Sequence, residues 1–261
     1  MEISRREFLK TLEVAGTSLL PFQISTIQAE ETQGLKEKRQ IQLDDFFEKN
    51  KGIFPHTKKL TYEESPNIFF IEKVIAEELF KPTEGLIFIP VDGNKIRGSY
   101  AYVIPRIENF GKKQKQDVYV FPKAFKLKEK ELEIILFHED FHCRDVYNGI
   151  RLNNEVFEAS KLKPFVLENI MELRSGFFQL EYILKKAVSR GEDFLHDVRV
   201  EFIQEREREY VKAYSNLGTL IEKGKPSDYE TSAIRKHLIG FDKWMAKKSR
   251  YQEKRSENGN K

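Results

Sequence analysis

Two histidines four residues apart, with a glutamate directly after the first, constrain the fold of this chain more than any other feature. They occur in the segment His138-Glu139-Asp140-Phe141-His142. Side chains four residues apart on a helix lie one above the other, so both imidazoles would point to the same place. Residues 134–137, just before the segment, are all apolar, which is typical of a helix buried under a sheet. The pattern therefore predicts a buried helix over residues 128–147.

The same three residues have the chemistry of a zinc site. Neutral imidazole is a good zinc ligand, and a tetrahedral site with one open position needs only one further protein ligand beside His138 and His142. Zinc lowers the pKa of a bound water. Glu139 can take the proton of that water and deliver it to a leaving amine. We therefore expect one Zn²⁺ per chain, with Glu139 as general base. The alternative is two ordinary histidines that happen to be four apart.

The third ligand is expected from a later helix. An H-E-x-x-H-x-x-G-x-x-H extension would need glycine and histidine where the chain has Asp145 and Asn148, so that form is excluded. Two glutamates, Glu168 and Glu172, lie on one face of the next expected helix, over residues 164–188. Either of them could complete the site, and an exposed acidic stripe is the structural alternative.

Small residues favour Glu172 over Glu168 as the ligand. Ser175 and Gly176 follow Glu172 at the positions three and four residues on, where they would let this helix approach the motif helix closely. Glu168 would then accept the second N–H of a ligand histidine and orient the ring. The reverse assignment stays open.

A histidine or tyrosine would stabilise the oxyanion at a zinc site of this kind, but no motif spacing in the sequence identifies which residue has this role. The candidates are aromatic or imidazole side chains near the expected helices: Tyr147, Tyr182, His196 and His237. Among them His196, which lies beside Asp197, is our first choice. Cys143 follows His142 directly and would point about 100° away around the helix, so we expect it in the core.

The whole pattern predicts an α+β chain rather than an alternating α/β chain. Helical spacing covers residues 45–54, 63–80, 128–147 and 164–188, a region from 193, and a short stretch near residue 244; strand-like runs cover 86–89, 99–104 and 117–121. We expect a small, mostly antiparallel sheet packed on the motif helix, followed by a helical C-terminal part.

His138, Glu139 and His142, with a glutamate on the next helix and a strand just before the motif helix, resemble the gluzincin class of zinc metallopeptidases. The resemblance implies a zincin-like fold and hydrolysis of peptide bonds. It also implies that a peptide or protein substrate docks as an added strand along residues 117–121, at the sheet edge. A catalytically inactive zincin-fold protein that binds metal or a partner is the alternative. The intact Glu139 favours the enzyme.

The N-terminus resembles a twin-arginine export signal. Residues 4–10 read Ser-Arg-Arg-Glu-Phe-Leu-Lys, an apolar stretch follows at 14–24, and residues 27–29 suit a cleavage site. The resemblance implies recognition by the twin-arginine export machinery and a periplasmic or extracellular location. We expect a signal peptide at 1–29, a polar linker at 30–45, one metallopeptidase domain at 46–246 and a disordered basic tail at 247–261.

Charge and hydropathy exclude several other classes. The formal net charge of +3 is nearly balanced, which argues against a nucleic-acid binder that relies on a strong field. The sequence contains no run of 18 apolar residues, so we expect no stable membrane span after processing. The single cysteine excludes an intrachain disulfide.

Overall fold

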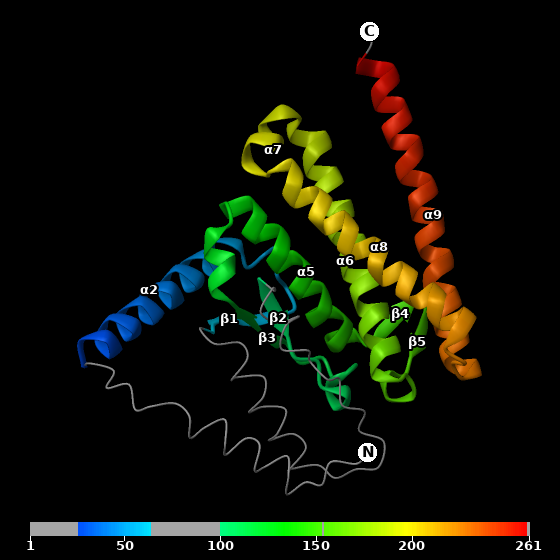
Figure 1. Ribbon diagram of the computed structural model, residues 1–261, viewed down its shortest axis with the longest axis horizontal. Coiled ribbons are helices and arrows are strands. Elements are labelled where there is room, and N and C mark those ends of the chain that lie inside the picture. The colour runs from blue at the N-terminus through cyan, green and yellow to red at the C-terminus, as the bar shows by residue number, and fades with distance from the viewer. Residues whose placement is uncertain (1–25, 64–99, 153, 260–261) are drawn as a thin grey trace, which may run out of the picture. The chain divides into compact units, whose positions relative to one another are not determined.

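A computed structural model describes residues 26–63, 100–152 and 154–259 of the chain (Figure 1). Its helices are α2 (Thr26–Asn50), α5 (Glu129–Asn148), α6 (Pro164–Arg190), α7 (Glu192–Asp197), α8 (Val200–Lys223) and α9 (Asp228–Gly259). Its strands are β1 (Thr57–Tyr62), β2 (Ala101–Val103), β3 (Gln116–Val120), β4 (Ile150–Leu152) and β5 (Glu155–Phe157). The fold is α+β with mostly helical content, which confirms the expected class. Within the described ranges, no helix is long and apolar enough to cross a membrane.

The larger sheet is mixed rather than mostly antiparallel. Its strand order is β1-β3-β2, with β1 parallel and β2 antiparallel to β3. Strand β3 is therefore central, and both of its edges carry backbone pairing. The expectation that residues 117–121 form a free edge for a docking peptide is wrong, because β1 occupies one side and β2 the other.

Strand β1 and the hairpin of β4 and β5 have no counterpart in the sequence expectations. In β1 the buried positions Thr57, Leu60 and Tyr62 are interrupted by two exposed lysines, which hide the apolar pattern. Strands β4 and β5 are three residues each and, in the part of the chain that the structure describes, form a two-stranded sheet of their own. Such short strands give too few positions for alternation to be recognised.

Helix α5 packs on the larger sheet and positions the two histidines. It covers almost the range that its apolar spacing predicts, and its end at Gly149 (φ 74°) confirms the expected stop. Its buried residues Ile134 and Ile135 belong to the same core as Val118 and Val120 of β3. The expected helix of residues 164–188 is α6, which contacts both α5 and α8.

Gly176 serves a different contact from the one expected. A Cβ atom at Gly176 would lie 2.4 Å from a ring carbon of Tyr210, which is on α8. That separation is too short for a carbon pair in contact, so the glycine permits α8, not α5, to approach α6 closely.

The two ends of the chain differ locally from the expectation. Residues 30–45, expected as a polar linker, lie within α2, and Leu43 is buried. Residues 247–261, expected as a disordered tail, are helical as far as Gly259. By its own contacts the chain separates into the units Met1–Ile41 and Gln42–Lys261. The proposed export motif at 4–10, most of the expected helix 63–80 and the strand at 86–89 lie outside the described residues.

Candidate metal centre

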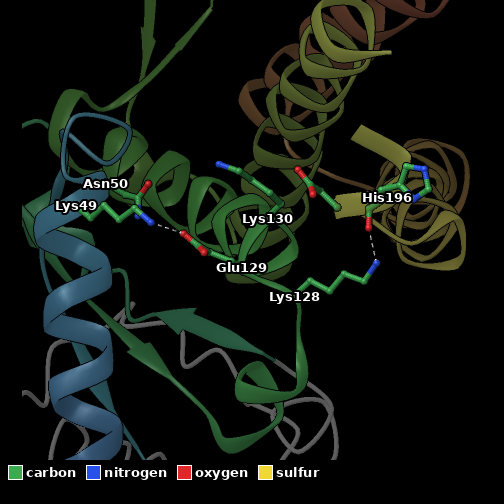
Figure 2. Close-up of a pocket in the computed structure, with 7 residues that line it drawn as sticks. Lys49, Asn50, Lys128, Glu129, Lys130 and His196 are labelled. Carbon is green, nitrogen blue, oxygen red and sulfur yellow. Dashed lines mark hydrogen bonds and ion pairs between the residues drawn. The ribbon is translucent and has the colours of Figure 1, made fainter. Parts of the chain in front are cut away.

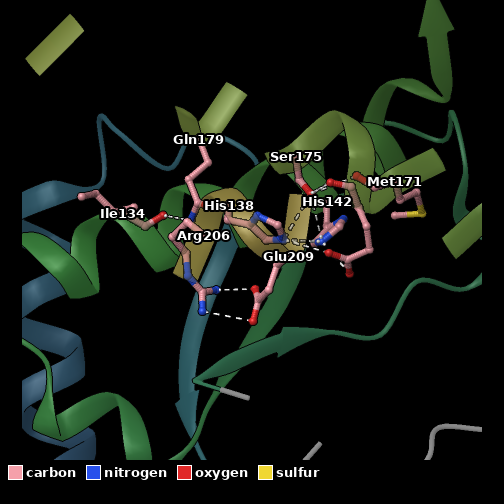
Figure 3. A network of polar contacts seen from close by, with 9 residues as sticks. Ile134, His138, His142, Met171, Ser175, Gln179, Arg206 and Glu209 are labelled. Atoms are coloured by element: carbon pink, nitrogen blue, oxygen red, sulfur yellow. Dashed lines mark hydrogen bonds and ion pairs between the residues drawn. The ribbon is translucent and has the colours of Figure 1, made fainter. Parts of the chain in front are cut away.

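The two motif histidines meet one glutamate of α6. His138 and His142 lie one turn apart on the same face of α5, and their Nε2 atoms are 3.1 Å from each other (Figure 3). A Glu172 carboxylate oxygen lies 3.3 Å from His138 Nε2, and its other oxygen lies 3.6 Å from His142 Nε2. One donor atom from each of the three residues falls within 4.8 Å of the others, so the group is positioned to hold a metal ion.

Glu172, not Glu168, is the glutamate that reaches the two imidazoles. Glu168 lies one helical turn earlier on α6 and is not part of the three-residue group. It does not orient a ligand histidine either, because Nδ1 of His138 and Nδ1 of His142 are buried without a hydrogen-bond partner in the described part of the chain. The expected N–H bond from a histidine to Glu168 is therefore wrong.

The carboxylate of Glu172 makes the group strongly attractive to a cation. Burial disfavours its charge, but hydrogen bonds with His138 and His142 outweigh burial and hold the pKa of Glu172 well below its usual range. Burial lowers the pKa of His142, yet the bond and charge of Glu172 raise it overall to about 9. Without a metal, the group therefore binds a proton tightly, and a metal ion would compete for the same place.

Glu139 is a buried carboxylate beside this group. Its side chain lies on α5, and only 7% of the residue is exposed. Burial raises the pKa of Glu139, with the two imidazoles and Arg206 opposing and Glu172 adding to the rise. A carboxylate whose pKa is raised towards neutrality is suited to accept and return a proton.

Arg206 brings a positive charge to the site from α8. Its guanidinium forms two hydrogen-bonded contacts with Glu209, at 2.7 and 3.2 Å (Figure 3). It also lies over the ring of Tyr100. Only 8% of Arg206 is exposed. Its charge lowers the pKa of Glu139. No motif in the sequence signalled this residue, since it lies within a run of alternating charges that reads as a solvated helix face.

Two buried carboxylates on α5 anchor the helix to its neighbours on either side of the site. On the sheet side, Asp140 accepts hydrogen bonds from the backbone N–H groups of His56 and Thr57, at 2.9 and 2.8 Å. On the α6 side, Arg174 donates to both carboxylate oxygens of Asp145, at 2.7 and 2.8 Å. Buried polar groups paired in this way hold the backbone that carries the two imidazoles.

His196 lies far from the two imidazoles. Its backbone carbonyl accepts a hydrogen bond from Lys128 Nζ, and both residues line a cavity of about 330 Å³ at the start of α5 (Figure 2). Lys128 precedes His138 by ten residues, which is about 15 Å of helix at 1.5 Å per residue. The structure therefore does not bring His196 together with His138, His142 and Glu172, and its role as an oxyanion stabiliser stays a prediction. The cavity belongs to the opposite end of α5.

The other aromatic candidates have structural contacts of their own. Tyr182 donates to Glu133 and stacks on Phe137, and Tyr147 meets the ring of His56 edge to face. His237 is buried against Phe157. Each of the three therefore has a packing or hydrogen-bonding role that explains its position.

Two further residues lie near His138, His142 and Glu172 although no sequence motif indicated them. Tyr102 of β2 has a pKa raised by burial and by the charges of Glu168, Glu172 and Glu139, so its hydroxyl lies in the field of the site's carboxylates. Ser175 Oγ lies 3.1 Å from His138 Nε2. Sequence patterns placed Tyr102 only in an alternating strand and used Ser175 only as a small residue.

Comparisons of the chain with protein-family models, with curated proteins and with solved structures found no match.

Proposed function

We propose that this protein is a zinc-dependent metallopeptidase of the gluzincin type. The observation that carries the proposal is the convergence of His138, His142 and Glu172, with Glu139 buried beside them on the motif helix. A protein that only stored a metal would need the three ligands but not a buried base of raised pKa. The arrangement supports the zincin-like interpretation of the small sheet and the motif helix.

The donor set fits zinc. Two imidazole nitrogens and one carboxylate oxygen form a three-ligand set that catalytic zinc sites use. The two Nε2 atoms and the Glu172 carboxylate face one another, which leaves the Nε2 lone pairs directed at the place where the ion would lie. His138, His142 and Glu172 would hold the ion. Zinc, when bound, supplies a Lewis acid and lowers the pKa of a water molecule.

Residues of this chain then carry the proton steps. Glu139 takes a proton from the attacking water and passes it to the leaving amine, which is the general acid–base role of a carboxylate with a raised pKa. Arg206 keeps Glu139 from becoming too basic, since its charge favours the carboxylate form. Tyr102 keeps its proton, because burial and the surrounding carboxylates raise its pKa, and it is our candidate donor to the developing oxyanion. We place the substrate beside β2, which carries Tyr102, and not on β3.

Metal analysis tests the first part of the proposal. Purified wild type should hold about one zinc per chain, and His138→Ala should hold none. Glu172→Gln should weaken zinc binding by about a hundredfold or more, since even residues that only support ligands contribute 10–100-fold. Glu168→Gln is the matched control, one turn away on the same helix, and should keep the metal. Absence of zinc from the wild type would remove the proposal.

Peptide cleavage tests the second part. Wild type should hydrolyse members of a broad peptide library, and a chelator should stop the cleavage until zinc is restored. Zinc binding without any chelator-sensitive cleavage would instead identify a catalytically inactive, metal-binding or partner-binding protein. Tyr102→Phe should lower kcat by about 10² without loss of zinc, which is the scale of removing one oxyanion donor.

Export is the remaining part of the proposal. The motif at residues 4–10 supports recognition by the twin-arginine machinery, which would move the folded chain across the cytoplasmic membrane. Replacement of Arg5-Arg6 by Lys-Lys should leave the full-length precursor inside the cell. Unchanged secretion of that variant would show that a different route, or none, is used.

A further inference from the structure

A hydroxyl group lies at the same place as the three metal donors. Ser175 is fully buried on α6, three residues after Glu172. Its Oγ lies 3.1 Å from His138 Nε2 and 3.4 Å from His142 Nε2 (Figure 3). The same oxygen therefore faces both imidazole nitrogens that the proposed zinc would occupy.

The hydroxyl has acceptors for its proton on its own helix, away from the imidazoles. Ser175 Oγ donates to the backbone carbonyls of its own helix, at 2.9 Å to Met171 and 3.3 Å to Glu172. A hydroxyl has one proton and two lone pairs. With the proton on the helix backbone, the lone pairs are the part of Ser175 that faces His138 and His142.

Lone pairs gathered in this way need a positive charge between them. With a metal bound, the imidazoles would carry their protons on Nδ1, and two Nε2 lone pairs, a carboxylate oxygen and the Ser175 oxygen would all face the ion. Nothing else cationic is in contact with these four atoms, as far as the described residues go; Arg206 has its guanidinium on Glu205 and Glu209. A bound cation removes the repulsion among all four at once.

The spacing of the donors agrees with coordination. Ligand atoms about 2.0–2.1 Å from a tetrahedral zinc ion lie about 3.3–3.4 Å from one another. The separation between the two Nε2 atoms is 3.1 Å, those from Glu172 are 3.3 and 3.6 Å, and those from Ser175 are 3.1 and 3.4 Å. Ser175 thus stands in the same relation to the imidazoles as the carboxylate does.

We infer that the Ser175 hydroxyl is a fourth protein donor to the metal, which gives the site two nitrogen and two oxygen ligands. The inference rests on the proposed metal site, but not on peptide cleavage. A neutral hydroxyl is the weakest of the four donors, and zinc also accepts five ligands, so the water needed for hydrolysis still has a place. Ser175 would tighten metal binding without closing the site.

The affinity for zinc is the first test, because it does not depend on activity. Ser175→Ala should weaken zinc binding at least tenfold in a competition titration with a coloured chelator. Its metal-free form should unfold like the wild type, since alanine favours a helix. Ser189→Ala is the matched control: Ser189 also donates to a carbonyl of α6, but it is exposed and belongs to the last turn. It should leave the affinity unchanged.

The second test places a spectroscopic ligand at the same position. Ser175→Cys loaded with Co²⁺ should gain a thiolate-to-cobalt charge-transfer absorption that the wild type lacks. The wild type is a sound reference, because its one thiol, Cys143, is buried beside Thr57 on another face of α5. No such absorption, or an unchanged zinc affinity of Ser175→Ala, would overturn the inference. Zinc binding and cleavage by the wild type would show that the proposed function still stood.

Discussion

The polar residues on the two faces of α5 differ in their hydrogen-bond partners. On the face towards β1, Asp140 is surrounded by donors: two backbone N–H groups, the Thr57 hydroxyl at 2.8 Å and His56 Nδ1 at 3.1 Å. On the face towards α6, the Nδ1 atoms of His138 and His142 have no partner among the described residues, and their Nε2 atoms meet each other, the Glu172 carboxylate and the Ser175 hydroxyl. A single residue separates Asp140 from each histidine in the sequence.

This contrast separates structural from functional polar groups. A buried polar group that is fully hydrogen-bonded stabilises the fold, whereas one that is left without partners costs stability and is retained for another reason. Asp140 holds β1 against α5. The polar contacts of His138 and His142 lead to each other, to Glu172 and to Ser175, an arrangement suited to holding a cation.

The largest effect is expected from Glu139, on the functional face. Glu139→Gln keeps the shape and burial of the side chain but removes the base, so kcat should fall by about 10²–10⁴-fold. Zinc content and the urea unfolding curve should stay those of the wild type. A variant that cleaved peptides at a normal rate would break the contrast, because Glu139 would then be a packing residue.

Asp140→Ala should have the opposite outcome. It leaves the buried backbone N–H groups of His56 and Thr57 without an acceptor, and each such group costs about 1–3 kcal/mol. We expect a loss of about 3 kcal/mol in the free energy of unfolding, measured with urea. Zinc content at a temperature where the variant is folded should be unchanged. Loss of zinc from well-folded Asp140→Ala would mean that the two faces are not independent.

His237 shows whether an unpartnered imidazole by itself implies a ligand. Its Nδ1 lies 2.7 Å from the Ala233 carbonyl, and its buried Nε2 has no partner among the described residues. It is not part of the metal group. Burial lowers its pKa to about 4, with Arg174 adding to the lowering and Asp145 and the Ala233 carbonyl opposing it. His237→Gln should therefore leave the zinc content unchanged.

The pH dependence of stability follows from the same shift. The pKa of His237 rises from about 4 in the folded chain to the ordinary 6.5 on unfolding, so the unfolded chain binds more protons between these values. Its stabilising contribution is complete above pH 6.5 and is lost as the pH falls towards 4. Between pH 8 and pH 5 the wild type should lose about 2 kcal/mol more stability than His237→Gln. Parallel curves would contradict this, because they would mean that His237 has the same pKa in the folded and the unfolded chain.

The smallest effect is expected from Cys143, on the structural face. Cys143→Ala removes one buried sulfur atom and should cost about 1 kcal/mol, seen as a small shift in the urea midpoint. Zinc content and kcat should not change, although His142 is the adjacent residue. A loss of zinc from Cys143→Ala would show instead that the thiol contributes to the metal site.

Local spacing predicted α5 and its two histidines, because helix periodicity depends only on neighbours in sequence. It also favoured Glu172 over Glu168, although the argument from Gly176 was wrong: the glycine faces Tyr210 of α8. Strand order could not be predicted, since it depends on which distant strands meet, and β3 is central only because β1 pairs with it. The two exposed lysines of β1 hid its apolar spacing, so no pattern in the sequence indicated a strand on that side of β3.

Ser175 and Arg206 were missed for a related reason. Each residue gains its meaning from a helix other than its own: Ser175 from the imidazoles of α5, and Arg206 from its nearness to Glu139. Single-helix patterns assign the first to small-residue packing and the second to a solvated charge run. Only the packing of α5, α6 and α8 distinguishes them from ordinary residues of the same type.

The close approach at Gly176 has a consequence for the acid–base behaviour of the site. Tyr210, which rests on that glycine, lies one turn after Arg206 on α8, so the spacing between α6 and α8 also sets how near the guanidinium comes to Glu139. A bulkier residue at position 176 would push the two helices apart and weaken a positive field acting on a carboxylate that it never contacts. The pKa of Glu139 would then rise, and the acidic limb of the pH–rate profile would shift, although the substitution removes no charge.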